Sequence, residues 1–173
     1  MTGQAFKRQC LLRHYIFQNM SLFDMFQPRE PQTGGVGDPP LNAQYTPDRI
    51  TSLGPNDIFV FGSNLQGRHA GGAARVAMNR FGAIFGQGVG LQGNTYAIPT
   101  MQGGVETIKP YVDEFIDFAK SRPDLTFYVT KIGCGIAGFT FEEIAPLFSE
   151  AVGESNVRLP KEFVEIITSN QLQ

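Results

Sequence analysis

The sequence predicts an α/β protein in which helices cover both faces of a mainly parallel or mixed sheet, a three-layer α/β/α sandwich. Short runs of β-branched and aromatic residues alternate with segments of helical periodicity. Glycine makes up 20 of the 173 residues and gathers in connections, with eleven between Gly62 and Gly104 and three more at positions 133, 135 and 138. With 42% hydrophobic residues, the chain can bury one sizeable core.

Composition divides the chain into two regions. The segment from Gln27 to Pro40 is rich in proline and glycine and has no periodicity, which is typical of a linker. We therefore expect an N-terminal extension and linker over residues 1–44, followed by one domain over residues 45–173. Met20 offers a second translation start, so whether residues 1–19 belong to the native protein stays open.

The first half of the domain predicts two strands and one helix. Asp57 to Phe61 is a β-branched and aromatic run after a turn, which indicates a buried strand. Residues 71–81 have helical spacing of apolar residues, and Gly82 follows as a stop signal. Thr95 to Ile98 reads as a second strand that ends at a proline.

The clearest helix is expected over residues 108–119, where apolar residues recur with spacing i, i+4, i+7, i+8 and i+11. Pro110 fits such a helix only if it lies in the first turn, because proline has no backbone N–H to donate. Residues 125–132 form the strongest strand pattern of the chain.

The C-terminal part predicts one more helix and one more strand. Thr140 and Glu143 have the spacing of a capping box, which predicts a helix through about residue 152. Pro146 is expected to distort that helix. The β-branched run over residues 163–168 predicts the last strand.

Charge and hydropathy exclude several classes of protein. The net charge of −2 and a sequence pI near 5.7 argue against a protein that binds a nucleic-acid polymer through a basic surface. No apolar run approaches the roughly 20 residues that span a bilayer, and the first residues lack the pattern of a signal peptide. We therefore expect a cytoplasmic protein that binds neither nucleic acid nor membrane.

The two cysteines do not indicate a disulfide framework or a metal site. Cys10 and Cys134 are far apart in the sequence, and neither belongs to a cluster of cysteines and histidines. The sequence therefore predicts no metal and no other cofactor.

Two glycine-rich loops follow predicted strands and precede predicted helices. They cover residues 62–73 and 132–139. Glycines let backbone N–H groups approach an anion, and the start of a helix adds unpaired donors and the positive end of its dipole. Because parallel strands end at the same edge of a sheet, both loops can face one phosphate-binding site.

Several of these segments resemble macrodomains, the ADP-ribose-binding fold. The resemblance rests on DIFVFGSN followed by GGAARVA, then TYAIP, then FYVTKIGCGIAGFTFEEIAPLF, and it covers roughly residues 57–160. The segments FVFGSN, GQGVGLQG, AIPT and GCGIAG are more closely similar to a group of macro-like proteins from bacteria and phages. The resemblance implies a macrodomain-like sandwich that binds ADP-ribose or a related nucleotide, with the diphosphate between the two loops.

The resemblance also implies roles for single residues. Asn64 would lie near the distal ribose, Phe139 beside a ribose, and Asp48 near the adenine. Ala74 stands where de-ADP-ribosylating members of the family carry a catalytic aspartate, which places that hydrolysis in doubt. The candidate ligand-binding residues are Asp48, Gly62, Ser63, Asn64, Gly71, Gly72, Gly133, Cys134, Gly135, Ile136, Ala137, Gly138 and Phe139.

The leading hypothesis is therefore a protein that reads or sequesters ADP-ribose or a related NAD-derived nucleotide. An alternative is a hydrolase acting on the ADP-ribosyl or phosphate bonds of such a ligand, with Asn64 positioning water and His69 assisting as a base. His69 is expected more simply as a solvated loop residue, and Cys134 as a small buried thiol. The uncharged strip at residues 87–93 either packs over a ligand or forms a contact in a homo-oligomer.

Overall fold

The computed structural model describes residues 44–172. The chain divides into two units, Met1–Gly37 and Asp38–Gln173, and all described residues belong to the second. The extension and linker expected over residues 1–44 thus lie almost entirely outside the described residues. Within residues 44–172, no helix is both long enough and apolar enough to cross a membrane.

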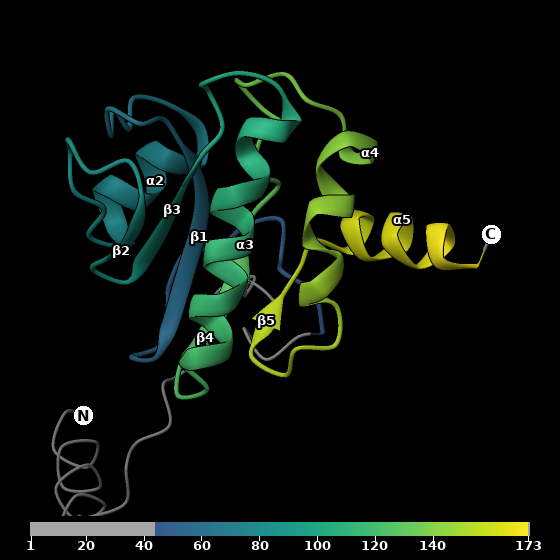
Figure 1. Ribbon diagram of the computed structural model, residues 1–173. Coiled ribbons are helices and arrows are strands. Elements are labelled where there is room, and N and C mark those ends of the chain that lie inside the picture. The colour runs from purple at the N-terminus through teal and green to yellow at the C-terminus, as the bar shows by residue number, and fades with distance from the viewer. Residues whose placement is uncertain (1–43, 173) are drawn as a thin grey trace, which may run out of the picture. The chain divides into compact units, whose positions relative to one another are not determined.

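The described residues form an α/β fold around one mixed sheet of five strands (Figure 1). The strands stand in the order β2-β3-β1-β4-β5, with β1 at the centre. Strand β1 pairs in parallel with β3 and β4, β4 pairs in parallel with β5, and only β2 runs antiparallel to its neighbour. The strands are β1 (Asp57–Ser63), β2 (Gly90–Gln92), β3 (Thr95–Pro99), β4 (Thr126–Val129) and β5 (Val157–Arg158).

Within residues 44–172, four α-helices and one 3-10 helix accompany the sheet. They are α2 (Gly72–Arg80), α3 (Val105–Ser121), α4 (Phe141–Ile144), the 3-10 helix η1 (Ala145–Ala151) and α5 (Lys161–Gln171). The connections β1-α2, β3-α3 and β4-α4 leave the carboxyl ends of three neighbouring parallel strands at one edge of the sheet. That edge is where open parallel sheets place ligands.

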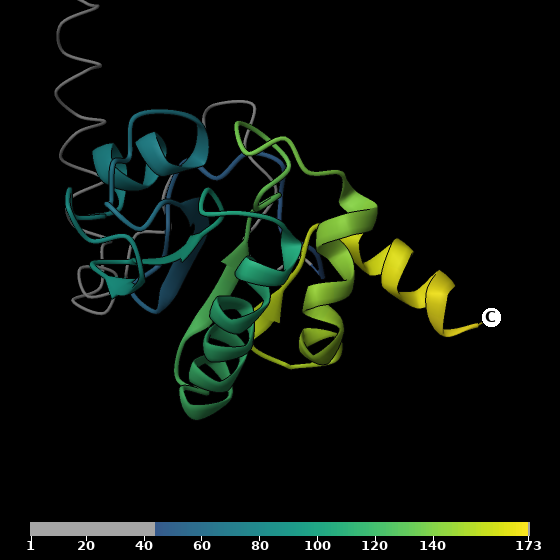
Figure 2. The same cartoon turned by 45° about the horizontal axis from the view of Figure 1, so that its top comes forward.

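Alternate residues of β1 enter two separate apolar clusters, because successive side chains of a strand point to opposite faces. Ile58 and Val60 pack in the cluster that contains the buried residues of α3, η1 and α5. Phe59 and Phe61 pack in a smaller cluster with two buried alanines of α2. Figures 1 and 2 show α2 and α3 on opposite sides of the central strands. Helices thus cover both faces of the sheet.

The predicted strand at 163–168 is wrong, because these residues lie in α5. Phe163 and Ile167 are both buried and are four residues apart, which places them on one helical face against the core. The fifth strand is instead the two-residue β5, and the predicted strand at 125–132 is shorter than expected. Its last residues form a turn in which the N–H of Ile132 donates to the carbonyl of Thr130 at 2.7 Å.

Pro110 lies in the second turn of α3, not in the first as expected, because the helix begins at Val105. Its missing N–H would have donated to the carbonyl of Glu106, one turn earlier. Both residues are exposed. Water can therefore hydrate the free carbonyl, which explains why the helix continues.

The capping box at the start of α4 is confirmed. The Thr140 side chain accepts from the N–H of Glu143 at 3.3 Å, and the Glu143 carboxylate accepts from the N–H of Thr140 at 2.8 Å. Pro146 also has the expected effect, since the segment turns into a 3-10 helix at Ala145.

We expect Thr140→Ala to lower the free energy of unfolding by about 1 kcal/mol, because the first turn of α4 loses its side-chain acceptor. Urea unfolding followed by circular dichroism measures the change. Thr140→Ser keeps the hydroxyl and should lose much less stability. Equal losses for both variants would contradict a capping role.

Candidate functional site

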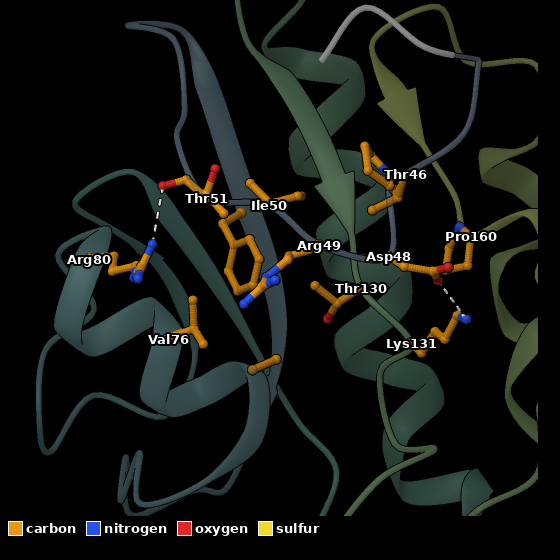
Figure 3. Close-up of a pocket in the computed structure, with 13 residues that line it drawn as sticks. Thr46, Asp48, Arg49, Ile50, Thr51, Val76, Arg80, Thr130, Lys131 and Pro160 are labelled. Carbon is orange, nitrogen blue, oxygen red and sulfur yellow. Dashed lines mark hydrogen bonds and ion pairs between the residues drawn. The ribbon is translucent and has the colours of Figure 1, made fainter. Parts of the chain in front are cut away.

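Two adjoining pockets lie along the edge where β1, β3 and β4 end. The first, which we call the loop pocket, has a volume of about 310 Å³ and is lined by both glycine loops and by Thr100 after β3. The second, the side pocket, has a volume of about 420 Å³ and is lined by residues 46–51, Phe59 and α2 (Figure 3). Ala73, Thr130 and Lys131 line both pockets, so the two share a border.

The first glycine loop is closed by its own asparagine. The Asn64 amide donates to the carbonyl of Arg68 and accepts from its N–H, both at 3.0 Å. Asn64 also lines the loop pocket, and its side-chain hydrogen bonds stabilise the conformation of the loop. The first N–H groups of α2, like those of any α-helix, have no intrahelical partner. Gly71 at the N-cap has no side chain that could accept from them.

The second glycine loop also leaves backbone donors free. Within the described part of the chain, the N–H groups of Gly133, Gly135, Ile136 and Ala137 have no hydrogen-bond partner. These four residues line the loop pocket. The N–H of Gly138 differs, because it donates to the carbonyl of Gly135 at 3.0 Å.

Three residues of the predicted second loop do not line either pocket: Cys134, Gly138 and Phe139. The Phe139 ring packs against the larger apolar cluster. It lies close under Gly133, where a Cβ would come within 3.4 Å of the ring and 3.1 Å of Ile144. Phe139 therefore supports the loop from below.

The two loops meet across the loop pocket. Ile136 is 76% exposed, yet a Cβ placed on Gly71 would come within 2.9 Å of its Cδ1 atom. The isoleucine thus reaches from the second loop to the start of α2. This contact confirms that the loops converge on one place, as their positions after β1 and β4 predict.

Lys131 carries the charge shared by the two pockets. Its Nζ lies 2.8 Å from the Asp48 carboxylate and 2.7 Å from Glu162, and it lies 5.7 Å from the centre of the Phe141 ring. The hydrogen bonds to Asp48 and Glu162 raise the pKa of Lys131, and the same contact lowers the pKa of Glu162. This network joins residues 46–51 to the end of β4 and to α5.

Asp48, expected near an adenine, lies in the side pocket and remains 83% exposed at its side chain. The segment that carries it is fixed by Thr46, whose N–H and hydroxyl donate to the carbonyls of Leu159 and Arg158 at 2.9 and 2.7 Å. The apolar part of the pocket is formed by Ile50, Phe59, Ala73 and Val76.

His69 is 1% exposed and is not the solvated loop residue expected from the sequence. Its Nε2 lies 3.1 Å from the carbonyl of Ile84 and therefore donates, because a carbonyl only accepts. Its Nδ1 lies 3.5 Å from the Ser63 hydroxyl, and its ring packs edge-on against Phe61. The local sequence around His69 gives no sign of this burial, because residues 84–92, which are distant in the sequence, cover the loop.

The strip at residues 87–93 packs against the first glycine loop. A Cβ on Gly88 would collide with the backbone of Asn64 and Leu65, and one on Gly67 would collide with Gln87. The buried Gln92 side chain fixes the same region, accepting from the N–H of Ile84 at 2.6 Å and donating to the carbonyl of Gln87 at 3.1 Å. Residues 87–93 thus pack closely against the first glycine loop and help to fix its backbone conformation.

Ala74, which by the sequence resemblance takes the place of the catalytic aspartate of de-ADP-ribosylating macrodomains, lines the loop pocket. Among the described residues that line this pocket, the charged side chains are Arg68 and Lys131 and none is a carboxylate. Asn64 lines this pocket with its amide bonded to the backbone of Arg68, whereas His69 is buried and does not line it.

We expect the Cys134 thiol to react slowly, because burial, followed by the nearby Glu142 and Glu143 carboxylates, raises its pKa to about 11. Fewer thiolates form at neutral pH, although each thiolate is more nucleophilic, so the net loss of rate is about tenfold. A Cys10→Ser variant isolates this thiol for reaction with a disulfide reagent. The same variant unfolded in urea is the control, and equal rates would contradict the prediction.

Several lining residues were not predicted from the sequence: Arg49, Phe59, Arg80, Thr100, Met101, Thr130 and Lys131. Thr100 directly follows β3, and Thr130 and Lys131 directly follow β4. The sequence placed Thr130 and Lys131 inside the strand predicted over residues 125–132, so the true end of β4 was missed. Arg49 and Arg80 come together only through the packing of residues 46–51 beside α2.

No protein-family model, curated protein or solved structure matches the chain. The described residues hold no group of three or more histidine, cysteine or acidic side chains that could bind a metal ion.

Proposed function

We propose that the protein binds ADP-ribose or a related NAD-derived nucleotide, as a reader or a sequestering protein. One observation carries this proposal: residues with unpaired backbone N–H groups, from two glycine loops that follow different strands, line one pocket. Free N–H groups at a helix start and in a glycine loop form a ready site for phosphate oxygens.

The diphosphate would lie in the loop pocket, between the start of α2 and residues 133–137. Donors from both sides can then contact different phosphate oxygens, as charge-assisted hydrogen bonds. The exposed guanidinium of Arg68 lines the same pocket and adds a positive charge. The absence of carboxylates among the described lining residues favours an anion there over a cation.

The nucleoside would occupy the side pocket. Its apolar residues, Ile50, Phe59 and Val76, suit the faces of a base, and Asp48 and three threonines supply polar groups. The border that the two pockets share at Ala73, Thr130 and Lys131 supports a single ligand that extends through both. Each volume falls within the range of typical ligand pockets, about 300–1,000 Å³.

The α/β fold, with helices on both faces of the sheet, is compatible with the macrodomain-like sandwich that the sequence motifs suggest, and we propose that relationship with the function. Calorimetric titration of the full chain tests the binding. ADP-ribose is expected to bind with a Kd below millimolar, and AMP more weakly because it carries one phosphate. NAD and cyclic ADP-ribose complete the series. If none of the four binds folded protein below millimolar concentration, the proposal fails.

A further inference from the structure

The side pocket has an uneven distribution of charge. At one end, Asp48 is paired with Lys131, which also contacts Glu162. Toward α2 lie the guanidinium groups of Arg49 and Arg80, on the side bordered by Val76 (Figure 3). Within residues 44–172, neither arginine forms an ion pair with a carboxylate.

The two arginines have donors to spare. Arg80 donates through one nitrogen to the carbonyl of Thr51, at a long 3.5 Å. No hydrogen bond from the Arg49 side chain to another described residue is present. A guanidinium presents five N–H donors in a planar fork that matches the oxygens of a phosphate. Two such groups lining one pocket therefore suit a phosphate group of the ligand.

The kind of side chain near a nucleotide ribose indicates what the ribose carries. A free carboxylate accepts from a ribose hydroxyl, whereas an arginine accommodates a phosphate in the place of that hydroxyl. In the side pocket the carboxylate is already paired and the arginines are not. We propose that this pocket recognises a phosphomonoester on the nucleoside ribose, so that the preferred ligand is a ribose-phosphorylated adenosine diphosphate. The inference rests on the proposed function, because it places the nucleoside in the side pocket.

Such a phosphate occurs in two chemical settings. A 2′-phosphate is carried by nucleotides derived from NADP, and a 3′-phosphate by those that contain 3′-phospho-ADP. Both would offer a dianionic phosphate to Arg49 and Arg80. Two pairs of probes distinguish them: 2′-phospho-ADP-ribose against ADP-ribose, and 3′-phospho-ADP against ADP.

Calorimetry with these four probes on the full chain tests the inference. We expect at least one phosphorylated probe to bind about tenfold more tightly than its unphosphorylated partner, since the arginines are exposed and partly screened. Raising the salt concentration should reduce this preference. A 2′ preference assigns the NADP-derived class, and a 3′ preference assigns the other.

Variants distinguish phosphate recognition by the two pocket arginines from a general effect of removing positive charge. The double variant Arg49→Gln, Arg80→Gln should bind each phosphorylated probe no more tightly than its unphosphorylated partner. Arg75→Gln is the matched control, because Arg75 is exposed on the same helix and lines neither pocket. Thermal unfolding checks that the variants are folded.

Three results would overturn the inference. If ADP-ribose binds without any gain from a ribose phosphate, the proposed function stands and this inference falls. A preference that survives in the double variant, or is lost equally in Arg75→Gln, would show that Arg49 and Arg80 do not recognise the phosphate. If no probe binds, both proposals fail together.

Discussion

Phe115→Ala is expected to lower the free energy of unfolding by about 3–5 kcal/mol, a large share of the roughly 5–15 kcal/mol of a typical domain. Phe115 is fully buried on α3, where its ring meets those of Tyr96, Phe127 and Phe148 at centroid distances of 5.1, 5.6 and 6.4 Å. These partners come from β3, β4 and η1, so the truncation leaves a cavity at the centre of the larger apolar cluster.

Chemical unfolding followed by circular dichroism measures this loss. The matched control is Phe85→Ala, because the Phe85 side chain is 71% exposed and its removal creates no cavity. The control should change stability by less than about 0.5 kcal/mol. Similar losses in the two variants would show that the aromatic cluster around Phe115 does not dominate stability.

The elements that carry strong periodic patterns were predictable from the sequence. The stripe of apolar residues on α3 fixes its buried face, and all five of its predicted apolar positions are buried. The run that forms β1 and the capping box of α4 are equally local signals. Such patterns survive in the fold because tertiary packing and local preference agree.

The wrong prediction of a strand at residues 163–168, which form part of α5, has a physical cause. The run is rich in β-branched residues, which favour strands, but Phe163 and Ile167 also satisfy the spacing of a helical face. Pro160 precedes the helix, and Glu162 lies in its first turn. These flanking signals indicate a helix start, and packing against η1 decides the outcome.

The candidate site was predictable only in part. The glycine loops could be expected to converge, because both follow strands that end at one edge of the sheet. The side pocket could not, since it depends on residues 46–51 lying beside α2 and on Thr46 pairing with residues 158 and 159. His69 illustrates the same limit, because a distant segment buries it.

A single added side chain in the second glycine loop should separate ligand binding from folding. Gly135 has no left-handed φ, and a Cβ placed on it would meet no atom within 4 Å. It lines the loop pocket, and its N–H is unpaired within the described residues. Gly138 is a poorer test, because its φ is +83° and its N–H is already bonded to Gly135.

We therefore expect Gly135→Val to leave the unfolding temperature nearly unchanged and to weaken ADP-ribose binding by roughly two orders of magnitude. The valine would fill the space that the diphosphate needs, and two lost charge-assisted hydrogen bonds at about 1.5 kcal/mol each, the lower end of the usual range, account for that loss. Gly135→Ala should have a smaller effect. Cys134→Ser, in the same loop but outside the pocket, should bind as the unmodified protein does. A folded Gly135→Val variant with full affinity would mean that the phosphates do not lie between the two loops.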